Sequence, residues 1–174
     1  LYHLIFIVKI KNIMKVCIVG NGLVSIALAK ALVNKGIYVD LFSNQKINKI
    51  DKSRTIGISK TNIDFFNKNI LNISKFLWEI KKIEVFSDNL KNEKLLNFKT
   101  DGENLFSIFK NADLYNYLFL NLKKSIFFKL LGKKSLISFK KYNLIINCDS
   151  TSKISKKYFY RKILKNYHSY AFTT

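Results

Sequence analysis

The chain contains no proline, and arginine is almost absent, since only two of its 31 basic residues are arginine. With 11 acidic residues, the formal net charge is +20. A charge this high suggests nucleic acid as a partner, but a nucleic-acid footprint is a basic patch or stripe in which arginine is the better ligand. The lysines here are scattered in ones and twos, and abundant Lys, Asn, Ile and Phe without proline fit an A/T-rich coding sequence. We therefore predict a solvated lysine surface and no specific nucleic-acid partner.

Cysteine and histidine are equally scarce, with two of each. Cys17 and Cys148 each end an apolar run, so we expect them to pack as small hydrophobic residues in a reducing compartment. His3 and His168 have no ligand-like neighbours at metal-binding spacing. The sequence therefore predicts no metal site, and the expected location is the cytoplasm.

No apolar run approaches the ~20 residues that a membrane-spanning helix needs. Residues 1–13, LYHLIFIVKIKNI, are apolar but too short, and they lack the small-residue cleavage site of a signal peptide. Met14 stands directly before a strand pattern. We expect residues 1–13 to be a non-native or disordered leader, or a weak extra strand, and Met14 to be the natural start.

One strong motif is present, VCIVGNGLVSIALAKAL at residues 16–32. It predicts a buried strand at 15–19, a glycine turn and a helix at 23–34, and a second strand at 37–42 completes a βαβ unit. In such a unit the first glycine allows the tight turn, the second lets the backbone approach a pyrophosphate, and the helix N-terminus faces the phosphates. The predicted cofactor contacts are Gly20, Asn21, Gly22, Leu23 and Val24. A tight βα turn without any ligand is the alternative.

Two positions depart from the complete dinucleotide fingerprint. Ser25 occupies the place of the third glycine, which serves close packing of helix on strand. The second strand ends in Ser43, where an acid would take the ribose hydroxyls. Asp40 is out of phase with Ser43 on a strand and should face the other way. Ser43 is therefore the predicted ribose contact, although a hydroxyl binds more weakly than a carboxylate.

The rest of the chain alternates strand and helix signals. Helices are expected at 62–71 and 112–122, half-exposed strands at 81–86, 94–98 and 105–109, and further strands at 135–139 and 142–148. This order predicts an α/β fold, in which a Rossmann-like βαβ domain carries an inserted small antiparallel sheet.

Several segments, in this order along the chain, resemble the FAD-dependent aromatic hydroxylases of the p-hydroxybenzoate hydroxylase type, and within them the ubiquinone-biosynthesis hydroxylases. They are VCIVGNGLVSIALAKALVNKGIYVDLFS, DKSRTIGIS, WEIKKIEVFSD with LLNF, DGENLFSIFKNADLYNYL, and LIINCDSTSKISK. The first segment is typical of FAD and NAD domains in general. The order of all of them, which covers most of residues 14–156, is what points to this family.

The resemblance implies FAD as cofactor and NAD(P)H as transient reductant. By position, Arg54 would approach the flavin and Asp149 would stand near the pyrophosphate and ribityl groups. A solvated loop arginine and a simple turn aspartate are the alternatives. The chain departs from the family at Ser150, where a glycine is usual, at Lys156, where an arginine is usual, and at Ala112, where a basic or polar cofactor contact is typical. No catalytic side chain can be named.

The resemblance also implies a division of the chain. Residues 14–174 would form an incomplete FAD-binding domain, built from 14–80 and 111–174, with part of a substrate-domain sheet at 81–110. The family's third motif, a Gly-Asp-Ala region, does not occur, so we expect a domain truncated at its C-terminus.

The function implied is the N-terminal FAD-binding portion of a monooxygenase that hydroxylates an aromatic ubiquinone precursor of the polyprenyl-phenol type. Its expected partners are a missing C-terminal half or other biosynthesis subunits. The alternative is a truncated or decayed non-enzymatic homologue, acting as a binding module or without function. Because such a precursor is membrane-soluble, peripheral contact at the inner membrane is a secondary expectation.

Overall fold

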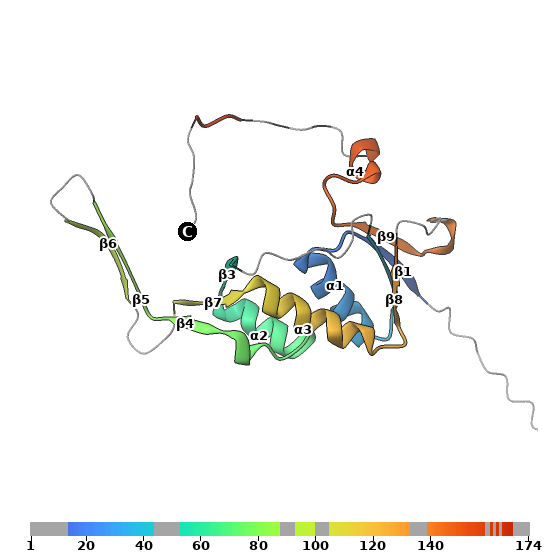
Figure 1. Ribbon diagram of the computed structural model, residues 1–174, viewed down its shortest axis with the longest axis horizontal. Helices are drawn as coiled ribbons and strands as arrows, with labels where there is room; N and C mark the ends of the chain where they lie inside the picture. The colour runs from blue at the N-terminus through green and yellow to red at the C-terminus, as the bar shows by residue number, and fades with distance from the viewer. Residues whose placement is uncertain are drawn as a thin grey trace, which may run out of the picture.

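The computed structural model describes residues 14–43, 53–87, 93–99, 105–132 and 139–158, together with residues 161, 163 and 165–168. Its elements form a four-stranded parallel sheet, a three-stranded antiparallel sheet and a two-stranded ribbon, with helices packed beside them (Figure 1). This arrangement confirms the predicted fold class, an α/β chain whose parallel sheet is accompanied by a small antiparallel sheet.

The parallel sheet has the strand order β8-β2-β1-β9. Its strands are β1 (Lys15–Val19), β2 (Tyr38–Phe42), β8 (Phe128–Leu131) and β9 (Leu144–Asn147). β1 lies between β2 and β9, so that Cys17 is opposite Asp40 on one side and Ile145 on the other. Among the described residues, the first strand, β1, therefore lies inside the sheet and gains its second neighbour only from the last one, β9.

Both faces of β1 are buried, which explains its uninterrupted apolar sequence. Val16 and Ile18 face the main core, where α1 (Leu23–Asn34) and α3 (Asn111–Lys123) pack against the sheet. Cys17 and Val19 face the opposite side and form a second, smaller cluster with Phe42 and Tyr142. The alternation of the strand thus divides four of its five residues between two cores.

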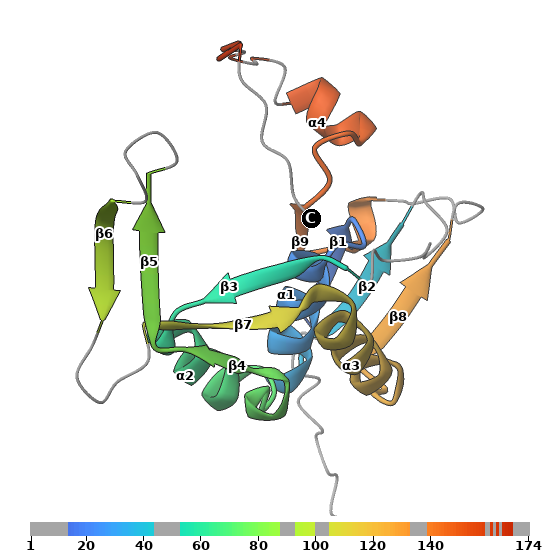
Figure 2. The ribbon, with the colours of Figure 1, turned by 60° about the vertical axis from the view of Figure 1, so that its left-hand side comes forward.

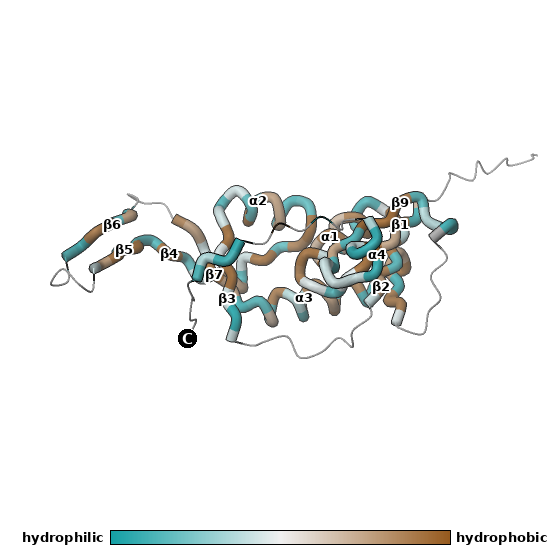
Figure 3. The backbone as a smooth tube through the Cα atoms, turned by 90° about the horizontal axis from the view of Figure 1, so that it is seen from above, coloured by the Kyte–Doolittle hydropathy of each residue, from teal (hydrophilic) through white to brown (hydrophobic). Residues whose placement is uncertain are grey.

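An insertion between β2 and α3 builds the antiparallel part of the molecule. β3 (Thr55–Ile58), β7 (Phe106–Lys110) and β4 (Trp78–Ile80) form a sheet in that order, next to α2 (Lys60–Asn69) and the short 3₁₀ turn η1 (Ser74–Phe76). β5 (Lys82–Phe86) and β6 (Lys94–Lys99) form a separate antiparallel ribbon. Figure 2 shows this ribbon standing away from the rest of the fold, and in Figure 3 it lies at the end opposite β9.

The helices begin and end at ordinary signals. α1 ends before Gly36, whose φ of +72° is the left-handed conformation usual after a helix. α2 begins two residues earlier than predicted because the Ser59 hydroxyl caps it, accepting a hydrogen bond of 3.4 Å from the Asn62 N–H.

Among the helices that the structure describes, none has both the length and the apolar character to cross a membrane.

Most predicted elements are confirmed with small shifts of their ends. α1 has the predicted bounds, and β5, β6, β7, α3 and β9 lie within two residues of the predicted ones. Three short strands, β3, β4 and β8, and the helix α4 (Lys153–Tyr158) were not predicted. The strand predicted at 135–139 falls almost wholly outside the described residues, and Phe139 begins a 3₁₀ turn, η2 (Phe139–Lys141). The proposed leader at 1–13 also lies outside them.

Candidate functional site

The candidate site lies where the carboxyl ends of β1 and β9 meet. The Gly20 N–H donates to the Phe42 carbonyl at 2.9 Å, and the Cys148 N–H donates to the Val19 carbonyl at 2.8 Å. From β1 the chain continues to β2 on one side, whereas β9 pairs on the other side. A crevice at such a change of direction is where open parallel sheets bind ligands.

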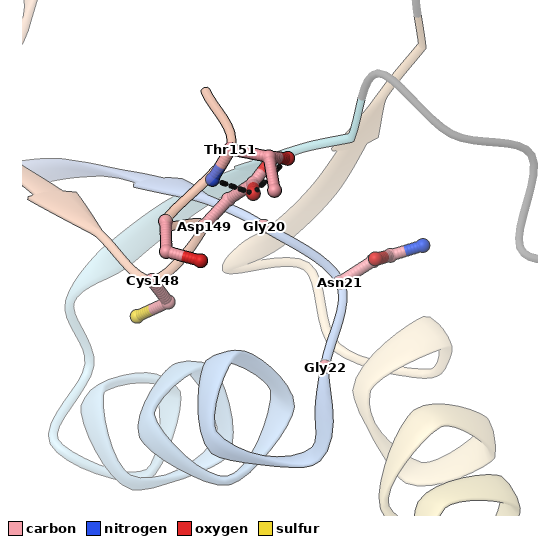
Figure 4. A pocket seen from close by; sticks show the side chains of 7 residues that line it. Gly20, Asn21, Gly22, Cys148, Asp149 and Thr151 are labelled. Carbon is pink, nitrogen blue, oxygen red and sulfur yellow. Dashed lines mark hydrogen bonds between the residues drawn. The ribbon is translucent and has the colours of Figure 1, made fainter. Parts of the chain in front are cut away.

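Two turns facing each other border an open cavity of about 200 Å³ at this point (Figure 4). One turn follows β1 and the other follows β9. The lining residues are Gly20, Asn21, Gly22, Cys148, Asp149, Ser150 and Thr151. The sequence motif and the end of the last strand, which are far apart along the chain, therefore form one site.

Gly20 is required by the fold itself. Its φ is +124°, which side chains rarely adopt, and a Cβ here would lie 3.0 Å from Ser25 Oγ and 3.2 Å from the Cys148 carbonyl carbon. This glycine allows β9 and α1 to approach the end of β1 together. Its role is the tight turn that the sequence predicts.

Gly22 has no such structural requirement. Its φ of −74° and ψ of 173° suit any residue, and a Cβ at this position would meet no atom within 4 Å. Because residue 22 is a glycine, the space beside its Cα, at the cavity and at the start of α1, stays open. A group held closely against the backbone, such as a pyrophosphate, gives a physical reason for a glycine here.

The N-terminus of α1 adds favourable electrostatics for an anion. Leu23 begins the helix immediately after Gly22, and the first turn contains no acidic residue. The positive end of the helix dipole is therefore not neutralised by a carboxylate of that turn.

Leu23 and Val24, both predicted as cofactor contacts, are absent from the cavity lining, and the Val24 side chain is 72% exposed.

Asp149 lines the cavity, but its carboxylate also holds its own turn. Its Oδ1 accepts hydrogen bonds from the Thr151 N–H at 2.8 Å and the Thr151 hydroxyl at 2.7 Å. Asp149 is thus a turn residue that also lines the cavity, and its predicted place near a pyrophosphate and ribityl group stays a prediction. Cys148 and Thr151 were not predicted as site residues, although the polar run directly after an apolar strand is a signal that could have indicated them.

Asp40 lies within β2, and Ser43 directly follows the end of that strand. Ser43 is buried after the end of β2, and its N–H donates to the Leu131 carbonyl at 3.2 Å. It does not line the cavity, and residues 44–52 are outside the described ranges. The predicted ribose contact of Ser43 stays a prediction.

Asp40 belongs to a buried polar group on the second face of the sheet. It accepts a hydrogen bond of 2.7 Å from the Tyr142 hydroxyl and forms an ion pair of 3.0 Å with Lys15. Burial, together with Asp40, raises the pKa of the Tyr142 hydroxyl well above its usual range. The same two causes, burial first, raise the pKa of the neighbouring Cys17 thiol to about 11. The Tyr142 hydroxyl and the Cys17 thiol therefore keep their protons at neutral pH.

Two further residues singled out by the sequence, Arg54 and Ser25, lie outside the cavity lining. Arg54 is exposed just before β3, and its carbonyl accepts a hydrogen bond of 2.9 Å from the Asn111 N–H. It is not part of the cavity lining, so its approach to a flavin stays a prediction. Ser25 is fully buried under the glycine turn, and its hydroxyl has no hydrogen-bond partner among the described residues.

The site contains no group of acids, bases or metal ligands that would carry chemistry alone. Within the described ranges, no three His, Cys, Asp or Glu residues lie close enough together to hold a metal ion. The cavity lining is glycine, small polar residues, one thiol and one carboxylate. Its geometry suits binding of a phosphate-bearing group rather than acid–base catalysis.

Comparison with known structures identifies the fold. The chain is similar to p-nitrophenol 4-monooxygenase PnpA from Pseudomonas putida (TM-score 0.57, 15% identity, covering 70% of this chain and 32% of that one). It is similar to a mutant of PqsL from P. aeruginosa (0.68, 15%, covering 88% and 47%). It is also similar to a Photorhabdus luminescens protein named as an FAD-containing monooxygenase (0.63, 16%, covering 84% and 42%).

These similarities place the fold with that of the FAD-dependent aromatic hydroxylases and monooxygenases. The chain spans about a third to a half of the length of these three proteins. No protein-family model matches the chain, and no curated protein sequence matches it either.

Proposed function

We propose that this chain is the FAD-binding portion of a flavin-dependent monooxygenase that hydroxylates an aromatic ring. The observation that carries the proposal is Gly22, an unstrained glycine with open space before it at the start of α1. The shared fold supports it, because one similar structure is named as containing FAD and another as acting on p-nitrophenol. The substrate that we propose is a polyprenyl-phenol precursor of ubiquinone, with NAD(P)H as the reductant.

In this proposal the chain itself binds and positions the cofactor. The turn from Gly20 to Gly22 and the α1 N-terminus would hold the pyrophosphate, and the turn from Asp149 to Thr151 would close the opposite side. Bound FAD, once reduced by NAD(P)H, supplies the activation of O₂ that the hydroxylation requires. The protein's own contribution is orientation and exclusion of water, which fits a cavity whose one carboxylate, Asp149, is hydrogen-bonded within its own turn.

The test is retention of FAD by the purified chain after incubation with excess FAD and desalting, measured by visible absorbance. We expect the wild type to retain flavin. Gly22→Ala should lower the affinity for FAD at least about tenfold, since its methyl group fills the space that a pyrophosphate would take. The free energy of unfolding of this variant should stay within about 0.5 kcal/mol of the wild type, because the backbone conformation suits alanine.

Gly20→Ala is the matched control for a purely structural glycine. We expect it to lower the free energy of unfolding by about 1–3 kcal/mol, because of its positive φ and its contacts with Ser25 and Cys148. If the wild type retained no flavin, or if Gly22→Ala bound FAD as tightly as the wild type, the proposed function would be wrong.

The second candidate function is a non-enzymatic homologue that no longer binds FAD. Two observations favour it: Ser43 stands where a carboxylate would take the ribose, and Ser25 leaves a buried hydroxyl without a partner where glycine would pack. A folded but colourless chain in the same experiment would support this second function.

A further inference from the structure

The second wall of the cavity is carried by a strand at the border of the sheet. Among the described strands, β9 pairs with β1 alone, on the side away from β2 (Figure 2). Two of its four side chains, Leu144 and Ile145, are 46% and 37% exposed, so burial of apolar surface attaches the strand only in part. Because the turn after β9 lines the cavity, the geometry of the site depends on what else fixes this strand.

Two polar attachments hold the chain directly before β9. The Asn143 N–H donates to the Lys15 carbonyl at 2.9 Å, and Asn143 Oδ1 accepts from the Lys15 N–H at 2.7 Å. This reciprocal pair joins the chain to the start of β1. Tyr142 reaches further, because its hydroxyl donates to Asp40 Oδ2 at 2.7 Å and Asp40 lies in β2. The Tyr142 side chain therefore spans β1 and connects the start of β9 with the strand beyond it.

The hydrogen bond between Tyr142 and Asp40 is buried. Tyr142 is 9% exposed and Asp40 is 4% exposed. The Tyr142 ring belongs to the smaller core cluster, together with Cys17 of β1 and Phe42 of β2. Asp40 also forms its ion pair of 3.0 Å with Lys15. A buried carboxylate is stable only when it is paired and hydrogen-bonded, and a hydrogen bond to a charged group is stronger than one between neutral groups.

The far end of β9 is where its position matters for the site. A Cβ at Gly20 would lie 3.2 Å from the Cys148 carbonyl carbon and 3.3 Å from its oxygen, so the turn after β9 closely approaches the glycine turn. β9 has only four residues between Asn143 and Cys148. Because a paired strand is a stiff element, a shift where β9 begins is carried along these residues to the cavity wall.

We propose that Asp40 and Tyr142 are positioning residues for the candidate site. Their hydrogen bond fixes β9 and thereby holds the turn from Asp149 to Thr151 at the separation from the glycine turn that a phosphate-bearing group requires. Asp40, the one acid of β2, does not line the cavity and acts on it through β9. A binding site is precise only when surrounding contacts fix the elements that carry it. The effect on cofactor affinity rests on the proposed function, whereas the effect on β9 does not.

The experiment combines amide hydrogen exchange of the full chain, measured by mass spectrometry, with titration of FAD. Tyr142→Phe removes the hydroxyl and keeps the ring. Exchange over residues 144–151 should become at least about tenfold faster than in the wild type, and the Kd for FAD should rise at least about threefold. Asp40→Ala should have the same two effects. Asp40→Asn keeps an oxygen that accepts from the Tyr142 hydroxyl, so it should lie between Asp40→Ala and the wild type on both measurements.

Tyr115→Phe is the matched control, because Tyr115 is a buried tyrosine of α3 and the chemical change is the same. It should leave exchange over residues 144–151 as in the wild type. Unchanged exchange there in Tyr142→Phe would overturn the proposal, and so would faster exchange with unchanged affinity for FAD. Equal acceleration in α2 would overturn it in favour of global destabilisation. A wild type that binds no FAD would contradict the proposed function, whereas faster exchange at 144–151 in Tyr142→Phe would still support the fixation of β9.

Discussion

At the scale of single residues, Ser25 is the clearest defect in the site. Its hydroxyl is fully buried between α1 and the turn at Gly20 and has no hydrogen-bond partner among the described residues. A buried polar group without a partner destabilises a protein by about 1–3 kcal/mol. Ser25→Ala should therefore raise the free energy of unfolding by about 1 kcal/mol, measured by urea denaturation.

A second substitution distinguishes this explanation from a simple packing effect. Ser25→Gly also removes the hydroxyl, but glycine inside a helix costs about 1 kcal/mol relative to alanine. Ser25→Gly should thus be close to the wild type and less stable than Ser25→Ala. If Ser25→Ala were less stable than the wild type, the hydroxyl would have a partner, for example a water molecule.

Cys17 makes stability depend on pH in the alkaline range. Burial and the nearby Asp40 raise the pKa of its thiol from 9.0 to about 11 in the folded chain. The folded state holds the thiol proton more tightly than the unfolded state does. The protonated Cys17 thiol therefore adds to the free energy of unfolding, and this addition is complete below pH 9. It is lost as the pH rises towards 11.

The measurement is urea unfolding at pH 7, 9 and 10.5 for the wild type and for Cys17→Ala. We expect the wild type to lose more stability than the variant between pH 9 and 10.5, by about 1 kcal/mol. Lysine titration affects both proteins alike and cancels in the comparison. Identical losses in the two proteins would show that the Cys17 thiol does not titrate as described.

At the scale of secondary-structure elements, the short helix α4 is attached to the end of β9 by two serines, Ser152 and Ser155. Ser155 connects α4 to both Asn147 and the Asp149 carbonyl, whereas the helix itself has only six residues. Isolated helices of this length are unstable in water. Ser155→Ala should therefore release α4 while leaving the sheet folded.

Limited trypsin digestion measures this release. In Ser155→Ala, cleavage after Lys153, Lys156 and Lys157 should become at least several-fold faster. Cleavage after Lys68 in α2 serves as the internal control and should not change. Equal acceleration at Lys68 would indicate global destabilisation rather than local release of α4.

The elements that the sequence predicts well are those with strong local signals. The glycine turn and the apolar periodicity fix β1 and α1, and the alternation of Lys82–Phe86 identifies β5. β8 was missed because it is a four-residue edge strand that contains Lys129, and its position follows from pairing with β2. α4 was missed because side-chain contacts hold it, not a helical pattern of its own. Likewise, the cavity wall at Cys148 and Thr151 depends on tertiary pairing of β9 with β1.

At the scale of the whole molecule, the ribbon of β5 and β6 adds little to the core. Its cross-strand pairs Ile83–Phe98 and Val85–Leu96 lie on one face, and Leu96 and Phe98 are about half exposed. Neither side chain belongs to a described core cluster. Replacing Leu96 and Phe98 together with threonine should therefore change the free energy of unfolding by less than about 1 kcal/mol.

The same double variant should reduce self-association. An exposed apolar ribbon face tends to pair with other chains, and threonine keeps the strand propensity while removing apolar area. Sedimentation velocity at increasing protein concentration measures the difference from the wild type. A large loss of stability in the variant would show instead that the ribbon face packs against the fold.

The pairing of β1 with β9 also has a consequence for synthesis. Val16 lies opposite Leu144. During synthesis, β1 therefore cannot pair with β9 until nearly the whole described chain has been made. Ribosomes add roughly 5–20 residues per second, so the waiting time is on the order of ten seconds. During that interval one edge of a strongly apolar strand is open to nascent neighbours and chaperones. The cavity is consequently among the last features to assemble, and the yield of native protein should respond to translation speed after β2.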